Sequence, residues 1–279
     1  MSPAAAAGTV RLGDLTVNRM GFGAMRVCGP DIWGPPKDRA AAHRVLQRAI
    51  ELGVSFLDTA DSYGPEVDET LIAEALYPYP AGLVIGTKGG LVRPTRHAWD
   101  PDGRPEHLRR AIDGSLKRLR LERIDLYQFH APDPRVPFAE SMSALAEAQR
   151  AGKIRHLGVS NVSVRQLAEA RRIAPIVSVQ NEYNLGDRSS DDVLAACEQA
   201  GIAFIPWFPL GAGRLLRSSK VQRAAKHAGA TPAQVAIAWL FARSPAMLPI
   251  PGTASVPHLE ENVAAAGLKL AAADLKALG

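Results

Sequence analysis

The sequence predicts an α/β fold, a (β/α)8 TIM barrel with a short N-terminal β-hairpin. Eight short apolar runs alternate with amphipathic stretches along nearly the whole chain. The runs are continuously apolar, as expected for parallel strands buried on both faces. A length of 279 residues is normal for one such barrel. A doubly wound sheet is the competing architecture, but eight repeated units fit a closed barrel better.

The expected elements begin with the hairpin at Thr9–Val17, whose turn is Leu12-Gly13-Asp14-Leu15 and which could plug the bottom of the barrel. Eight strands are then expected at Met20–Met25, Val54–Thr59, Leu83–Lys88, Ile124–His130, Ile154–Ser160, Ile176–Gln180, Ala203–Trp207 and Met247–Ile250.

Helical periodicity and capping residues place helices between these strands. Apolar side chains recur at helical spacing within 108–119 and 138–149. Ser163 with Gln166, and Thr231 with Gln234, have the spacing of capping boxes. Glycines that can adopt a left-handed conformation follow three of the helical stretches, at Gly53, Gly152 and Gly201.

Composition argues against several classes of protein. The net charge is only +5 and the basic residues are scattered, which disfavours nucleic-acid binding. Two distant cysteines, Cys28 and Cys197, indicate neither a disulfide framework nor a metal site. The N-terminus lacks the features of a signal peptide, and the longest apolar run, Val235–Ala242, is too short to span a membrane. We therefore expect a cytoplasmic monomer or small homo-oligomer.

Polar side chains end three consecutive predicted strands. Asp58 ends the second strand and is followed by Tyr63, Lys88 ends the third, and His130 ends the fourth. Each alone has an ordinary explanation, such as a turn cap, a solvated lysine or a hydrogen-bonded core histidine. Because all strands of a barrel end on one rim, where barrel enzymes carry their chemistry, we expect the four side chains to converge.

Such a group suits proton transfer. The pKa of a tyrosine is about 10, and a neighbouring ammonium lowers it by stabilising the phenolate. Lys88 would act in this way on Tyr63, and Asp58 would hold the lysine in place. His130 could donate a hydrogen bond to a substrate oxygen. The set is suited to protonating a carbonyl oxygen while a hydride arrives at carbon.

The segments that carry these residues resemble the aldo-keto reductases. In chain order they are DTADSYG, GTKGG, FHAPDP, GVSN, QNEYN, PWFPLG and EEN. The resemblance covers roughly residues 9–265. It implies a single barrel domain over residues 1–279, a catalytic tetrad of Asp58, Tyr63, Lys88 and His130, and reduction of small carbonyl compounds by a nicotinamide cofactor.

A cofactor is required because no side chain supplies a hydride. The segment GFGAMR lacks the third glycine of a Rossmann fingerprint, so the cofactor is expected to lie across the barrel mouth, as in the family. The resemblance implies that Gly23 and Met25 contact the cofactor, that Ser160, Asn161 and Gln180 bind its carboxamide, and that Trp207 lies against the nicotinamide face. It implies that the pyrophosphate is bound by Phe208, Pro209, Leu210 and Gly211. It also implies that Thr253 lies near the 2′-phosphate, and Glu261 and Asn262 near the adenine. Ordinary core packing is the alternative for Trp207.

The chain departs from the family at the 2′-phosphate. Gly252 and His258 stand where many members have lysine or arginine. Backbone N–H groups at a helix start near Pro257, or the cations Arg214, Arg217 and Lys220 of the segment GRLLRSSK, could compensate. NADP(H) is expected, with NAD(H) as the alternative.

The substrate pocket is expected to include Trp33 and Trp99, which would suit a flat or apolar carbonyl compound, although both could instead anchor proline-rich loops. IWGPPKDR and IPGTASVPHLEEN resemble a bacterial subgroup that includes pyridoxal reductases, which makes pyridoxal a candidate substrate. Two alternatives remain. The barrel could be a cofactor-binding regulatory subunit with little turnover, or an aldolase or isomerase that uses Lys88 as a Schiff base.

Overall fold

The computed structural model describes residues 2–279 and is built around a curled sheet. Seven parallel strands follow one another in the order β11-β10-β9-β8-β5-β4-β3. Their bounds are β3 Phe22–Gly23, β4 Phe56–Asp58, β5 Val84–Gly89, β8 Ile124–Phe129, β9 Ile154–Ser160, β10 Ile176–Gln180 and β11 Ala203–Phe204. The predicted α/β barrel is confirmed, with β3, β4 and β11 shorter than expected.

The eighth expected strand, Met247–Ile250, is wrong as a strand assignment. Met247 forms an isolated parallel bridge with Phe204, and the Leu248 N–H donates to the Phe204 carbonyl at 2.8 Å. On the other side, the Gly21 N–H donates to the Pro249 carbonyl at 3.0 Å. Proline has no N–H with which to continue a ladder. The segment therefore closes the barrel between β11 and β3 without forming a regular strand.

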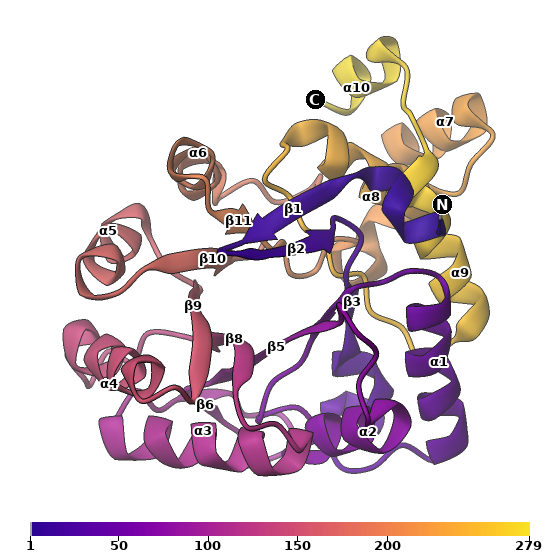
Figure 1. Cartoon of the computed structure of the whole chain (residues 1–279). Helices are drawn as coiled ribbons and strands as arrows, with labels where there is room; N and C mark the ends of the chain where they lie inside the picture. The colour runs from indigo at the N-terminus through magenta and orange to yellow at the C-terminus, as the bar shows by residue number, and fades with distance from the viewer. Residues whose placement is uncertain (1) are drawn as a thin grey trace.

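The predicted hairpin is confirmed. Strands β1 (Thr9–Leu12) and β2 (Leu15–Asn18) pair antiparallel (Figure 1). Leu12 and Val17 are buried in the cluster that fills the barrel interior, together with side chains such as Phe56 and Leu126. The hairpin thus buries apolar side chains against the lower end of the barrel.

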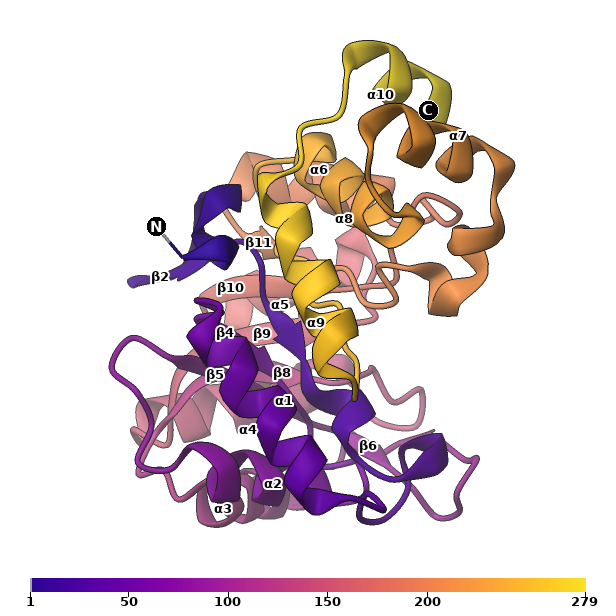
Figure 2. The ribbon, with the colours of Figure 1, turned by 90° about the vertical axis from the view of Figure 1, so that its right-hand side faces the viewer.

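Helices surround the sheet (Figure 1). They are α1 Arg39–Glu51, α2 Val67–Leu76, α3 Pro105–Leu119, α4 Phe138–Arg150, α5 Val164–Ile173, α6 Asp191–Ala200, α7 Ser219–Ala228, α8 Pro232–Arg243, α9 Val256–Ala264 and α10 Ala272–Leu278. Both predicted capping boxes form, at the starts of α5 and α8. In Figure 2, α1 and α9 lie side by side, and Arg48 is 2.8 Å from Glu260 across this contact.

Short elements occupy the connections. The 3-10 helices are η1 Pro3–Ala7, η2 Ala24–Val27, η3 Pro30–Ile32, η4 Gly211–Arg217 and η5 Ala265–Gly267. Strands β6 (Leu91–Val92) and β7 (Asp100–Pro101) form an antiparallel ribbon in the loop after β5. No helix within residues 2–279 is long and apolar enough to cross a membrane.

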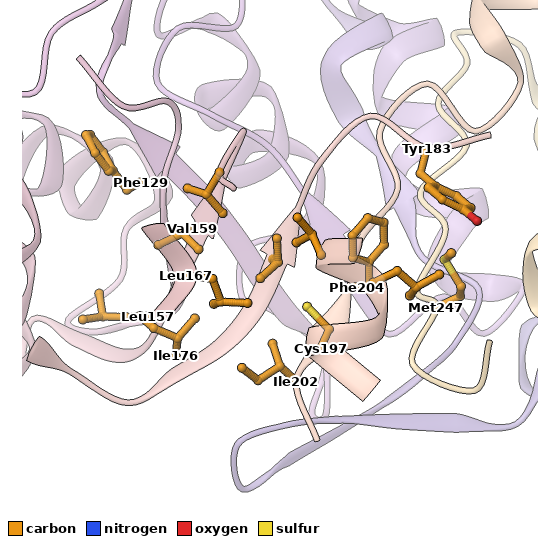
Figure 3. Packing of buried hydrophobic residues seen from close by; sticks show 14 of the residues in the cluster. Phe129, Leu157, Val159, Leu167, Ile176, Tyr183, Cys197, Ile202, Phe204 and Met247 are labelled. Carbon is orange, nitrogen blue, oxygen red and sulfur yellow. The ribbon is translucent and has the colours of Figure 1, made fainter. Parts of the chain in front are cut away.

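The main core lies between the sheet and the helices. Figure 3 shows strand residues such as Val159 and Phe204 facing Leu167 of α5 and Cys197 of α6. Both cysteines are buried free thiols. These contacts pack the helices against the outer face of the sheet.

The closing seam depends on two glycines. A Cβ on Gly252 would lie 2.3 Å from the carbonyl oxygen of Gly23, and one on Gly23 would lie 2.7 Å from that of Ile250. We expect Gly252→Ala to lower the free energy of unfolding by about 1–3 kcal/mol, because the backbone at Gly23 must move to make room for the new Cβ. Urea unfolding measures this. Gly267→Ala is the matched control, since its nearest neighbour is 3.8 Å away; equal losses in both variants would contradict the prediction.

Candidate active site

A cavity of about 500 Å³ opens at the carboxyl ends of the barrel strands. Its walls come from strand ends and from the loops that follow them. The predicted residues that line it are Gly23, Met25, Asp58, Tyr63, Trp99, His130, Ser160, Asn161, Gln180, Trp207, Phe208, Pro209, Leu210 and Gly252. The rim predicted to hold the chemistry therefore surrounds one cavity.

A buried lysine joins the two residues of the segment FLDTADSYG. Lys88 is fully buried, and its Nζ donates to Asp58 Oδ1 at 2.6 Å, to the Thr59 carbonyl at 2.9 Å and to Tyr63 Oη at 3.1 Å. An ammonium has three N–H donors, so all of them are used. Lys88 does not line the cavity and lies behind Tyr63, which does.

The second carboxylate oxygen of Asp58 is held by two glutamines. Gln180 Nε2 donates to it at 2.8 Å and Gln128 Nε2 at 3.2 Å, while Ser178 Oγ donates to Gln128 Oε1 at 3.3 Å. The sequence analysis did not single out Gln128. A polar side chain inside the apolar run of β8 is the signal that could have identified it. Its contacts make Asp58 a fixed partner for the lysine.

Burial sets the protonation state of Tyr63. Burial raises the pKa of Tyr63 to about 12, although the nearby charge of Lys88 acts in the opposite direction. Burial also opposes the charge on Lys88, but Asp58 and Tyr63 together hold the pKa of Lys88 above its usual range. Lys88 lowers the pKa of Tyr63, as expected from the sequence, but burial raises this pKa by more. At neutral pH, Tyr63 is therefore a phenol that carries its proton.

His130 lies beside Tyr63 at the cavity wall. The two ring centroids are 5.8 Å apart in an edge-to-face arrangement, and His130 Nδ1 is 3.4 Å from Ser62 Oγ. Burial, with a smaller effect of the Lys88 charge, holds the pKa of His130 well below its usual range. A neutral imidazole has one N–H to donate, so this residue can orient an oxygen without carrying charge.

Four of the predicted cofactor residues form a connected group on one wall. Ser160 Oγ donates to the Gln180 carbonyl at 2.6 Å, and Asn161 Nδ2 donates to the His130 carbonyl at 2.9 Å. Trp207 Nε1 donates to Asn161 Oδ1 at 3.2 Å. Asn161 has a positive φ of 57°. These contacts fix polar side chains beside the catalytic rim.

The other predicted residues do not line the cavity. They are Trp33, Gly211, Arg217, Thr253, His258, Glu261 and Asn262. Arg217 and His258 are exposed, whereas Asn262 is buried. Ser255, the N-cap of α9, makes no side-chain capping bond. The first turn of α9 can therefore offer N–H groups to an anion, which fits the phosphate of a nicotinamide cofactor.

Sequence reasoning missed several lining residues, among them Arg26, Ile32 and Leu91. Arg26 is the one arginine or lysine on the cavity wall in the described part of the chain. Trp33 instead pairs through its backbone with Gly64, so its expected place in the substrate pocket is not found. Its neighbour Ile32 takes that place.

A barrel whose mouth holds a protonated phenol, a buried ammonium and a neutral imidazole defines an oxidoreductase that acts on carbonyl groups. The aldo/keto reductase family model matches residues 19–279, and the chain belongs to this family.

Three comparisons agree with this assignment. The chain is 52% identical over 268 residues to an uncharacterised oxidoreductase of Schizosaccharomyces pombe, covering 96% of this chain and 87% of that one. It is 46% identical over 269 residues to pyridoxine 4-dehydrogenase of Escherichia coli, covering 94% of each. An aldo-keto reductase of Klebsiella pneumoniae, solved in complex with NADPH, superposes with a TM-score of 0.82 at 28% identity, covering 97% of this chain and 93% of that one.

We expect His130 to stay neutral as the pH falls from about 8 to about 5.5, because its ordinary pKa of about 6.5 is strongly lowered. The unfolded chain binds this proton more readily, so His130 makes the fold less stable as the pH falls below about 6.5. Imidazole ¹⁵N shifts, assigned with a His130→Asn variant, measure the charge. Titration of this ring near pH 6.5 would show that water reaches it.

Proposed function

We propose that the protein reduces aldehydes and ketones to alcohols with NADPH, and that an aromatic aldehyde such as pyridoxal is its substrate. The observation that carries the proposal is the contact of buried Lys88 with both Asp58 and Tyr63 at the cavity wall. Such a set of groups has one evident use, which is to deliver a proton to an oxygen bound in the cavity.

Each residue of the proposed tetrad has a separate role. NADPH supplies the hydride when it is bound. Tyr63 gives its proton to the carbonyl oxygen as negative charge develops there, and Lys88 stabilises the resulting phenolate. Asp58 keeps the lysine charged and in place. The neutral His130 donates a hydrogen bond that orients the oxygen towards Tyr63. In the direction of alcohol oxidation, the phenolate takes the proton back.

The residues present fit the cofactor. We assign the carboxamide to Ser160, Asn161 and Gln180, which already form one hydrogen-bonded group. The other cofactor residues follow the family pattern: Gly23, Met25 and Trp207 near the nicotinamide, 208–211 at the pyrophosphate, Gly252, Thr253, His258 and Arg217 near the 2′-phosphate, and Glu261 with Asn262 at the adenine. The similar Klebsiella pneumoniae reductase, solved in complex with NADPH, supports NADPH as the cofactor.

The proposed substrate class has two supports. The relative from Escherichia coli is a pyridoxine 4-dehydrogenase, and the cavity wall includes the apolar side chains of Ile32, Leu91 and Trp99. A panel of pyridoxal, 4-nitrobenzaldehyde and propanal, followed at the nicotinamide absorbance band with NADPH and NADH, tests it. A protein that binds NADPH but turns over none of them would instead be the regulatory subunit. Trapping with borohydride tests the Schiff-base alternative at Lys88.

Tyr63→Phe should lower kcat for aldehyde reduction by about 10²–10⁴-fold, because the ring still packs but has no proton to give. Its Kd for NADPH, measured by fluorescence titration, should stay close to that of the wild type. Tyr79→Phe is the matched control, since its hydroxyl donates to the Leu119 carbonyl away from the cavity. A Tyr63→Phe enzyme with normal kcat would remove Tyr63 from the role of acid.

Arg217→Ala and His258→Ala should each weaken NADPH about two- to fivefold while changing NADH less, because exposed pairs with a phosphate contribute little individually. The preference for NADPH should also shrink with added salt, which screens exposed charges. Equilibrium Kd values for both cofactors measure these effects. Lys269→Ala, after η5 at the other end of α9, is the control. A wild type that binds NADH as tightly as NADPH would overturn the cofactor assignment and leave the tetrad untouched.

A further inference from the structure

Arg93 ties together two loops of the cavity rim. It follows β6, is only 7% exposed, and donates through its guanidinium to four backbone carbonyls. Two belong to Asp31 (3.3 Å) and Ile32 (3.1 Å) in the loop after β3. The other two belong to Arg96 and Ala98 in the loop after β5. The nearby carboxylate of Asp31 pairs instead with Arg96, at 3.5 Å.

The first of these loops is held in an unfavourable conformation. Asp31 has φ 59° and Ile32 has φ 58°. A positive φ is unusual for any residue with a side chain and is an outlier for a β-branched one, so other interactions must hold it. Arg93 donates to the carbonyl of each of these two residues. The side chain of Ile32 lines the cavity as a result.

The second loop carries Trp99, against which Arg93 stacks. The guanidinium carbon lies 3.7 Å from the centroid of the Trp99 ring and 5.4 Å from that of Trp33. Trp99 is 36% exposed and lines the cavity, with its ring centroid 6.2 Å from that of Tyr63 in an edge-to-face arrangement. Arg93 therefore fixes a half-exposed indole beside the proposed acid.

We propose that Arg93 is the positioning residue of the substrate pocket, setting Ile32 and Trp99 as the apolar walls that select a flat aromatic carbonyl compound. The predicted changes in KM rest on the proposed function, whereas the predicted changes in aldehyde binding do not. A planar fork reaches carbonyls of two loops and stacks on an indole at once, which a lysine cannot do. Arg93 makes no contact with the tetrad side chains and acts only through the walls.

The experiment compares an aromatic probe, 4-nitrobenzaldehyde, with a small one, propanal. Arg93→Met should raise KM for 4-nitrobenzaldehyde at least about tenfold, equal to about 1.4 kcal/mol, and change KM for propanal and Kd for NADPH less than about twofold. Equilibrium dialysis of 4-nitrobenzaldehyde with the NADP⁺-loaded protein gives the same comparison without turnover. His97→Ala is the control, because His97 lies in the same loop and its side chain is exposed.

Two further variants test whether Arg93 acts through Trp99. Trp99→Ala should raise KM for 4-nitrobenzaldehyde as Arg93→Met does. In the Trp99→Ala background, Arg93→Met should raise this KM much less than it does in the wild type, because both substitutions remove the same wall. Arg93→Lys, which keeps the charge, should change KM in the same direction as Arg93→Met. If Arg93→Met fails to fold, Trp99→Ala and Arg93→Lys decide the question.

An equal rise in KM for both aldehydes, an equal loss of NADPH affinity, or no change in any of them would overturn the role of Arg93. A wild type that binds 4-nitrobenzaldehyde without reducing it would overturn the proposed function alone, because the Kd comparison still tests Arg93. A wild type that does not bind this probe at all would overturn the inference.

Discussion

The buried ammonium of Lys88 is the constraint on which the rest of the site depends. A buried charge is costly unless it is paired and hydrogen-bonded, and here each of the three protons has an acceptor. Asp58 is buried beside Lys88, and its second oxygen accepts hydrogen bonds from donors on β8 and β10. Side chains from β4, β5, β8 and β10 are thereby linked around one charge, and Tyr63 lines the cavity next to this network.

The protonation states follow from burial more than from neighbouring charge. The sequence analysis counted the charge of Lys88, which is evident from residue types, but not the desolvation of Tyr63, which depends on the packed structure. With the pKa of Tyr63 raised to about 12, the phenol keeps its proton until negative charge develops on a bound oxygen. His130 is neutral for the same reason. Of these two groups, only the phenol is then suited to be the acid, which divides the roles between them.

The strands and the tetrad were predictable because both follow from local rules. Apolar runs mark the strands, and the ends of parallel strands meet on one rim. The segment 247–250 was wrongly predicted as a strand because the prediction used its apolar pattern alone. Pro249 and Pro251 have no N–H groups and cannot donate hydrogen bonds to a neighbouring strand. Arg26 and Arg93 were missed because loop side chains find their partners through non-local contacts. Nothing around Arg93 in the sequence indicates that it reaches Asp31, 62 positions away.

Reaction and selectivity are carried by different parts of the molecule. The proposed proton-transfer groups lie on strands or in the segments that follow them, and Asp58, Lys88 and Tyr63 are joined by hydrogen bonds to one buried charge. Ile32 and Trp99 lie on loops, and the Arg93 guanidinium joins these loops by contacting backbone carbonyls and an indole ring. Backbone carbonyls are present whatever side chains a loop carries. The loop sequences can therefore change, and with them the shape of the pocket, while the guanidinium still holds the loops and the buried charge network stays as it is.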